Sequence, residues 1–177
     1  ALIKDPRGDG SLVECNEGGD TSFILTINPT PRLSVQQDDL LYCDSSEVSF
    51  NVTDELAGAT NTTAYHLTRE YDNNKVIIEG QSPRKLDNLG YGPFTDQVRN
   101  LTNDVQMISY TFKPVIVDPV GDGSILECNE GGDTTITITI NPTPDLRVSI
   151  SENVFCDSST IEFNVADELV GSTGARV

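Results

Sequence analysis

The chain has very little of several residue types that common protein classes need. It has no Trp, one Met and one His, and its 11 Lys and Arg face 28 Asp and Glu, for a formal charge of -17. Because such an acidic surface repels phosphate groups, nucleic acid is not expected as a partner. An anionic membrane surface is disfavoured for the same reason. No apolar run reaches the roughly 18 residues that span a bilayer, so membrane insertion is not expected either.

The scarcity of His also limits the chemistry. A nucleophilic Ser or Cys needs a neighbouring base, and His66 is the one imidazole of the chain. A zinc site is not expected, because no two cysteines are spaced as Cys-x-x-Cys and there is no second His. The sequence therefore predicts no enzyme activity and no cofactor.

The chain does contain a long sequence segment that occurs twice with few changes. Asp5 opens DPRGDGSLVECNEGGDTSFILTINPTP, and Asp118 opens DPVGDGSILECNEGGDTTITITINPTP. The same offset continues, since CDSSEVSFNVTDELAGAT from Cys43 matches CDSSTIEFNVADELVGST from Cys156. We call this offset, from Asp5 to Asp118, the repeat period. It is too long for a solenoid unit but suits a whole domain. We therefore expect a tandem array of domains.

Each copy of this segment ends in NPTP. Two prolines in four residues end a strand and stiffen the backbone, as a short linker between domains requires. The predicted linker residues are Asn28, Pro29 and Pro31 in the first copy, and Asn141, Pro142 and Pro144 in the second.

Divisions just after each NPTP split the chain into three parts. Residues 1–31 are predicted to be the C-terminal part of one domain, 32–144 a complete domain, and 145–177 the N-terminal part of a third. Because the chain starts with Ala in the middle of a repeat, we expect it to be a segment of a longer protein.

Alternation of apolar and polar residues predicts β-strands. The expected inward-facing sets are Val48, Phe50 and Val52; Tyr65, Leu67 and Arg69; Ile108, Tyr110 and Phe112; and Ile136, Ile138 and Ile140. Their equivalents in the flanking copies are Phe23, Leu25 and Ile27, and Ile161, Phe163 and Val165. No segment shows a helical period. About seven strands in about 110 residues predict an all-β fold of tandem immunoglobulin-like β-sandwich domains joined by short Pro-containing linkers.

The segments YTFKPVIV, GDGSILEC and TITITINPTP, followed by VFCDSSTIEFNV, resemble the PKD-like, immunoglobulin-like repeats of giant secreted proteins of the Bacteroidetes. In that family a domain opens with a Cys, small polar residues and a strand, and closes with a second Cys, a Thr-rich strand and NPTP. Many family members carry a Trp in the middle strand, where Tyr65 and Leu67 are expected to pack here.

The resemblance implies an extracellular, cell-surface location. Proteins with such repeats include adhesins and filaments that work in gliding motility, and many are exported by type IX secretion. The implied partners are neighbouring repeats of the same chain, with other copies in a fibre or a surface anchor as further partners.

All four cysteines lie at equivalent repeat positions, Cys15 with Cys128 and Cys43 with Cys156. An even, patterned set in an acidic β-protein fits an oxidising, extracytoplasmic place. One pairing joins Cys43 to Cys128 inside one domain, so that Cys15 and Cys156 pair outside this segment. The other joins Cys15 to Cys43 and Cys128 to Cys156 across the linkers.

The intradomain bond is favoured, because each domain then folds alone and the family resemblance points the same way. One argument opposes it. A plain immunoglobulin topology puts the two positions at opposite ends of the sandwich, whereas a disulfide needs Cα atoms within about 7 Å.

Five acidic residues near one predicted hairpin are weak candidates for a calcium site, because hard cations favour carboxylate oxygens. They are Asp118, Asp122, Glu127, Glu130 and Asp133. The spacing of an EF-hand is absent.

Two functions remain in competition. The first is a structural repeat of a long extracellular adhesin or filament, in which stiff sandwiches on short linkers form a stalk or fibre. The alternative is an adhesive module that recognises a glycan or a protein through its loops. Its candidate loop is DNLGYGPF, Asp87–Phe94, whose aromatic side chains we expect to be exposed.

Overall fold

The computed structural model describes residues 3–4, 7–10, 14–15, 19–56, 62–80, 83–124, 126–150 and 152–167. These residues form fourteen strands, β1 to β14, and no helix. In this part of the chain there is accordingly no helix long and apolar enough to cross a membrane.

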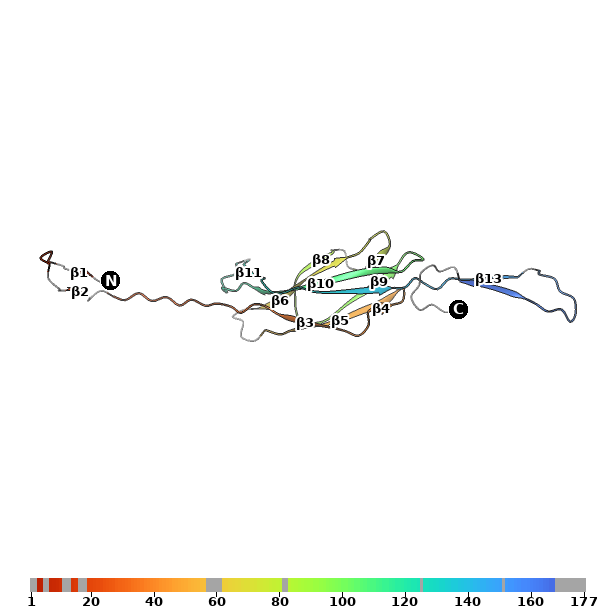
Figure 1. Cartoon of the computed structure of the whole chain (residues 1–177), viewed down its shortest axis with the longest axis horizontal. Helices are drawn as coiled ribbons and strands as arrows, with labels where there is room; N and C mark the ends of the chain where they lie inside the picture. The colour runs from red at the N-terminus through yellow and green to blue at the C-terminus, as the bar shows by residue number, and fades with distance from the viewer. Residues whose placement is uncertain are drawn as a thin grey trace.

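Two sheets packed face to face form a β-sandwich in the middle of the chain (Figure 1). The first sheet has the order β3 (Leu33–Gln37), β5 (Ser46–Asp54), β9 (Gly92–Asn100) and β7 (Val76–Glu79). The second has the order β4 (Leu41–Tyr42), β12 (Thr134–Ile140), β10 (Gln106–Val117), β6 (Thr63–Glu70) and β8 (Lys85–Leu89). The short strand β11 (Glu127–Cys128) pairs with the end of β10. The prediction of an all-β, sandwich-like fold is confirmed.

The sandwich has two distinct ends. We call the end where the chain arrives at Leu33 the upstream end. Asp54 lies at this end because it pairs with Leu33. Strand β11 lies there as well, where its Cys128 pairs with Ile116 of β10. The chain leaves after Ile140 at the downstream end, where Ile140 pairs with Tyr42 on one side and with Gln106 on the other. The β4–β12 pairing is parallel, and every other strand pairing of the sandwich is antiparallel.

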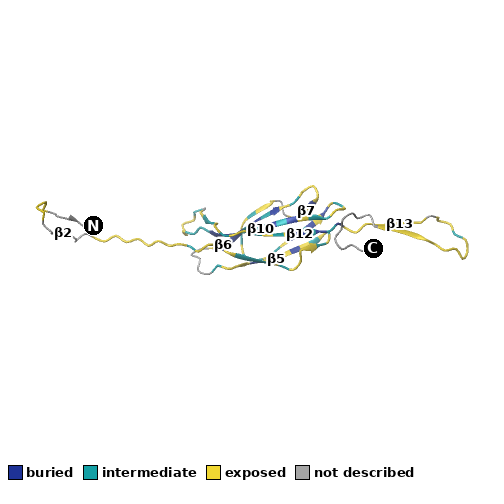
Figure 2. Ribbon diagram, viewed as in Figure 1, coloured by how far each residue is buried: buried dark blue, intermediate teal, exposed yellow. Residues whose placement is uncertain are grey.

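The residues that the alternation predicts to face inward in β5, β6, β10 and β12 do face the core, and Val76, Ile78 and Val98 of β7 and β9 join them there. The core cluster consists of Val48, Phe50, Val52, Tyr65, Leu67, Val76, Ile78, Val98, Ile108, Tyr110, Phe112, Ile138 and Ile140, with Ile136 packed against it. Figure 2 shows that the buried residues gather in the sandwich and not in the segments on either side of it. All strands of the two sheets and the whole core cluster fall between residues 33 and 140.

Aromatic rings join the two sheets at the centre of this core. The ring of Phe50, from β5, lies 4.7 Å from that of Tyr110 and 5.3 Å from that of Phe112, both on β10 of the opposite sheet. Tyr65 packs on Phe112 at 5.8 Å between centroids. Tyr65 and Leu67 are fully buried in β6, so the prediction that they pack the middle strand is confirmed.

A buried ion pair crosses between the sheets beside these rings. Arg69 of β6 contacts Asp96 of β9 through two pairs of atoms, Nε to Oδ2 at 2.8 Å and Nη2 to Oδ1 at 2.9 Å. Their side chains are 1% and 0% exposed. Burial raises the pKa of Asp96, and the charge of Arg69 opposes that shift. The alternation predicts the inward direction of Arg69, but its partner is 27 residues away and no local pattern marks it.

Hairpins on either side of the sandwich repeat its local structure. In β13 (Leu146–Ile150) and β14 (Phe163–Asp167), Leu146 pairs with Asp167 as Leu33 pairs with Asp54, and the whole register is that of β3 and β5 moved by one repeat period. Similarly, β1 (Ile3–Lys4) and β2 (Glu14–Cys15) pair in the register of β10 and β11.

Residues with positive φ repeat in the same way. Ser45 and Ser158, which are equivalent positions, have φ angles of 59° and 67°. Gly8 and Gly121, in the repeated GDGS turn, have φ angles of 65° and 75°. Related sequences one repeat period apart therefore adopt the same backbone turns.

The apolar faces of the flanking copies are not buried in this chain. Leu25, the equivalent of the fully buried Ile138, is 75% exposed, and Phe23 and Ile27 are exposed to a similar degree. Phe163 and Val165 of β14 and the nearby Ile161 are exposed as well. The inward packing predicted for these two sets is not formed, because in the described part of the chain residues 21–27 belong to no sheet and no second sheet covers β13 and β14.

The repeat offers a matched pair of substitutions for the core. Ile138→Ala should lower the free energy of unfolding by about 2–5 kcal/mol, because it opens a cavity under β12. Leu25→Ala, at the equivalent but exposed position, should leave the stability of the sandwich unchanged. Urea unfolding of both variants measures the difference, and equal losses would mean that residues 21–27 pack into the same core.

The ion pair should behave as a unit. Asp96→Asn leaves the buried guanidinium of Arg69 without a counter-charge and should cost about 3–5 kcal/mol. The double variant Arg69→Met/Asp96→Leu removes both charges and should be clearly more stable than Asp96→Asn. Unfolding free energies of Arg69→Met, Asp96→Leu and the double variant give the coupling, and simple additivity would contradict the pairing.

Candidate functional site: the two NPTP segments

The downstream NPTP segment, Asn141–Pro144, is attached to the sandwich that it leaves. The backbone N–H of Asn141 donates to the carbonyl oxygen of Tyr42 at 2.8 Å, and the hydroxyl of Thr143 donates to Oδ2 of Asp44 at 2.5 Å. Pro142, between them, is buried. The segment therefore continues the edge of β12 along β4 for three residues beyond the strand.

Asp44 supplies the electrostatic part of this attachment. Partial burial raises its pKa, but hydrogen bonds from Thr143 and from the backbone N–H of Asn100 outweigh burial and hold the pKa below the usual 3.8. A carboxylate with a lowered folded pKa stabilises the fold above its unfolded pKa, and this stabilisation is lost as the pH falls through the folded value. The attachment is thus complete at neutral pH.

The upstream NPTP segment, Asn28–Pro31, contacts the sandwich that it enters. Pro31 is buried, and its carbonyl oxygen lies 2.4 Å from the place where a Cβ of Gly131 would stand. Only glycine allows this approach. The side-chain amide of Asn28 donates to the carbonyl oxygen of Pro119 at 3.4 Å. The loops before and after β11 therefore contact the NPTP segment that enters the sandwich.

The turn between β10 and β11 is organised by Asp118. Its carboxylate accepts the backbone N–H groups of Gly121 and Gly123, each at 2.9 Å, and that of Asp122 at 3.1 Å. Asp118 itself has a φ of 47°. The repeated Asp and Gly residues of this turn therefore serve backbone geometry.

The structure does not support the calcium hypothesis. The carboxylate oxygens of Asp118 accept hydrogen bonds from backbone N–H groups, and the carboxylate of Glu127 contacts His66. The remaining candidates, Asp122, Glu130 and Asp133, do not join them: within the described residues no three His, Cys, Asp or Glu side chains are placed to hold a metal ion.

His66 bridges two carboxylates next to this turn. Its Nε2 lies 3.1 Å from Oε2 of Glu127 on β11, and its Nδ1 lies 3.1 Å from Oδ1 of Asp87 on β8. The imidazole is 12% exposed. The bridge ties β11 to the neighbouring strands. Sequence reasoning missed it, because Glu127 is 61 residues from His66 and no motif links them.

The predicted Cys43–Cys128 disulfide is wrong. Both residues are free thiols. Cys43 follows β4 at the downstream end, whereas Cys128 pairs with Ile116 at the upstream end. The stretch of β10 from Gln106 to Ile116 separates these ends by about 33 Å, at about 3.3 Å per residue, far beyond disulfide reach.

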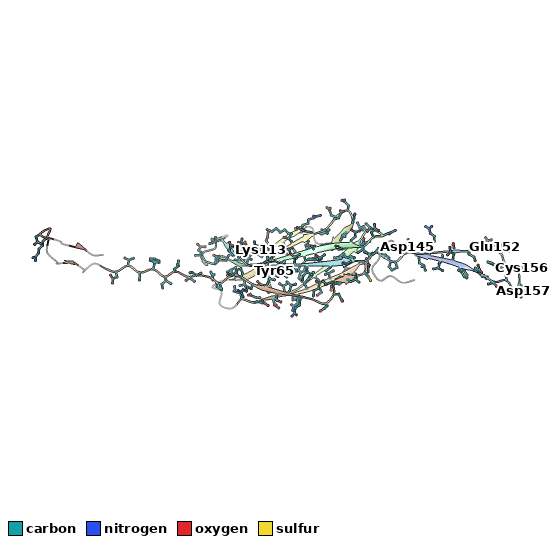
Figure 3. All side chains as sticks on the ribbon, in the orientation of Figure 1. Tyr65, Lys113, Asp145, Glu152, Cys156 and Asp157 are labelled. Atoms are coloured by element: carbon teal, nitrogen blue, oxygen red, sulfur yellow. The ribbon has the colours of Figure 1, made fainter. Side chains whose placement is uncertain are left out.

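The alternative pairing of Cys128 with Cys156 is not formed either. Cys156 is also a free, exposed thiol. It lies at the tip of the β13–β14 hairpin, beyond the downstream end and away from the sandwich (Figure 3). Cys128 lies at the opposite, upstream end. The side chain of Cys15 lies outside the described residues.

The candidate binding loop, Asp87–Phe94, does not present its aromatic rings to solvent. Its ends belong to β8 and β9. The hydroxyl of Tyr91 donates to the carbonyl oxygen of Ala64 at 3.1 Å, and burial raises its pKa to about 12. Phe94 packs toward Phe50 with 6.3 Å between centroids. The expectation of exposed aromatic side chains in this loop is therefore wrong.

No protein-family model matches the chain, and no curated protein matches it. The two NPTP segments are repeated elements that contact the sandwich at its opposite ends.

The glycines after β11 provide a test of the upstream contact. Gly131→Ala should displace Pro31, because the new Cβ would lie 2.4 Å from its carbonyl oxygen. Trypsin should then cleave faster after Arg32, the next residue. Gly132→Ala is the matched control, since its Cβ would meet nothing within 4 Å. Equal cleavage rates in the two variants would show that Pro31 is not held at Gly131.

Proposed function

We propose that the chain is part of a rod of tandem immunoglobulin-like sandwiches, and that this rod is the stalk or fibre of a long extracellular surface adhesin or filament. Each sandwich corresponds to one repeat period, with divisions after residues 31 and 144. The role is mechanical and needs neither a catalytic site nor a cofactor.

The observation that carries the proposal is the pair of NPTP contacts. Asn141–Pro144 is bound to the sandwich that precedes it, and Asn28–Pro31 is bound to the sandwich that follows it. Because the two segments have the same sequence, an NPTP between two sandwiches makes both sets of contacts. Such a linker is a stiff joint, since four residues are held from both sides.

The exposed flanking strands support the same arrangement. Residues 21–27 have the sequence pattern of β12 but expose Leu25 and its neighbours, and β13–β14 has the register of β3–β5 but exposes Phe163 and Val165. In an array each of these faces is covered by the rest of its own sandwich. Burial of those side chains would then contribute favourable free energy, as it does for Ile138.

The positions of the chain ends favour a rod over a cluster. The chain arrives at one end of the sandwich and leaves at the opposite end, so that the flanking segments extend in opposite directions (Figure 1). Twelve residues of β10 give each sandwich a length of about 40 Å. Successive sandwiches joined by four residues then stack end to end.

Charge and sequence resemblance support the location. A formal charge of -17 favours solubility and keeps neighbouring rods apart. The resemblance to PKD-like repeats of secreted Bacteroidetes proteins is consistent with surface adhesion, gliding motility and type IX export. The alternative of a binding module has weaker support, because Tyr91 and Phe94 pack inward.

Small-angle scattering tests the rod. The protein to measure is the present chain with a second copy of 32–144 inserted after Pro144, which supplies two complete sandwiches. We expect an elongated particle with a narrow range of shapes. Thr143→Ala/Pro144→Gly at the central joint removes the bond to Asp44 and the proline restriction, and should lower the radius of gyration while both sandwiches stay folded.

Thr135→Ala is the control for that experiment. It removes a hydroxyl that bonds to Thr111 at 2.9 Å on the outer face of the sandwich, far from the joint. It should leave the scattering unchanged. If the two-sandwich protein without substitutions is already as compact and variable in shape as the joint variant, the NPTP segment is a flexible tether and the rod proposal is wrong.

A further inference from the structure

Each end of the sandwich carries one cysteine beside an NPTP segment. At the downstream end, Cys43 stands between Tyr42 and Asp44, and these two neighbours bind Asn141 and Thr143. Cys43 is therefore held alongside Pro142, and its thiol is free and exposed.

The other cysteine has the corresponding position at the upstream end. Cys128 lies three residues before Gly131, which touches Pro31 of the upstream NPTP segment. Strand β11 is fixed by its pairing with Ile116 and by the contact of Glu127 with His66. The thiol of Cys128 is free and half-buried.

In a tandem array these two positions meet at one joint. The NPTP after a sandwich is bound to Tyr42 and Asp44, the two neighbours of Cys43, and the same NPTP is bound at its far end by the β11 loop of the next sandwich. Four residues span at most about 14 Å, and Cys43 lies beside the middle of that span. Cys43 and the counterpart of Cys128 in the next sandwich therefore lie near the same short segment, which favours their approach to the roughly 7 Å between Cα atoms that a disulfide requires.

We propose that Cys43 forms a disulfide with the counterpart of Cys128 in the sandwich that follows, so that a covalent bond crosses each joint of the rod. The inference rests on the proposed function, because it needs a neighbouring sandwich. The partner lies one repeat period beyond Cys128.

Other disulfide pairings would join cysteines that lie too far apart in the array. Cys43 and Cys128 of one sandwich are separated by its full length. Cys43 and Cys156 both belong to downstream ends, so a whole sandwich separates them in the array. The downstream cysteine of one sandwich and the upstream cysteine of the next are the combination that shares a joint.

The reaction is an ordinary thiol–disulfide exchange. A thiolate of one cysteine attacks a disulfide oxidant, either a protein disulfide or oxidised glutathione, and displaces one of its thiols. The second cysteine attacks the mixed disulfide and displaces the other thiol. The two protein thiols lose two protons and two electrons, and the oxidant gains both as two thiols. An extracytoplasmic place supplies such oxidants.

The two-sandwich protein described above tests the bond. In one variant Cys43 of the first sandwich and Cys128 of the second are kept, and every other cysteine is changed to Ser. The matched control keeps the opposite combination, Cys128 of the first sandwich and Cys43 of the second. Both are incubated with a glutathione redox buffer, and free thiols are counted on the monomer fraction under denaturing conditions.

We expect no free thiols in the first variant, with an intact mass two hydrogens lower than after reduction, and two free thiols in the control. Two free thiols in both variants, or bonds found only in intermolecular dimers, would overturn the inference. Scattering of the fully reduced protein separates this result from the proposed function. If no disulfide forms but the reduced protein is elongated, only the disulfide proposal is wrong. If the reduced protein is compact and variable in shape, the rod proposal is wrong as well.

Discussion

The buried contact of Arg69 with Asp96 joins the two sheets of this sandwich and is costly to leave half-made. An immunoglobulin domain of the antibody type joins its sheets with a disulfide packed on a Trp. In this chain there is no Trp, and the cysteines lie at the ends. Two buried charges and the rings around Phe50 connect the sheets instead. Because an unpaired buried charge is costly, the pair favours one alignment of β6 against β9. At the downstream end, Asn100 of β9 donates to Oδ1 of Asp44 and to the carbonyl oxygen of Ile140, next to the NPTP segment that follows.

The sequence predicts the faces of the strands well, because alternation is local. The predicted inward residues in 32–144 are buried except for Ile136, which is partly buried, and Arg69 is a charged residue on the same buried face as Tyr65 and Leu67. Contacts between distant residues are not predictable in this way. Asp96 as the partner of Arg69, and Glu127 as the partner of His66, depend on which strands become neighbours. The Cys43–Cys128 pairing failed for the same reason, because the choice required the order of the strands and their ends.

The repeat also lets the chain serve as its own comparison. Leu25 and Ile138 occupy equivalent positions, but one is exposed and the other is fully buried. The turns at Ser45 and Ser158 keep the same φ although one belongs to the sandwich and the other to the isolated hairpin. Turn geometry therefore follows from the local sequence, whereas burial depends on the strands of the complete sandwich.

The parallel pairing of β4 with β12 has a consequence for a protein under tension. A pull on the two chain ends draws β4 toward the upstream end and β12 toward the downstream end, along the direction of the strands. The hydrogen bonds from Thr139 to Leu40 and from Asn141 to Tyr42 lie across that direction. They are loaded in shear, so they must break together and cannot open one after another. The two-residue strand β4 thus resists extension of the sandwich along its length.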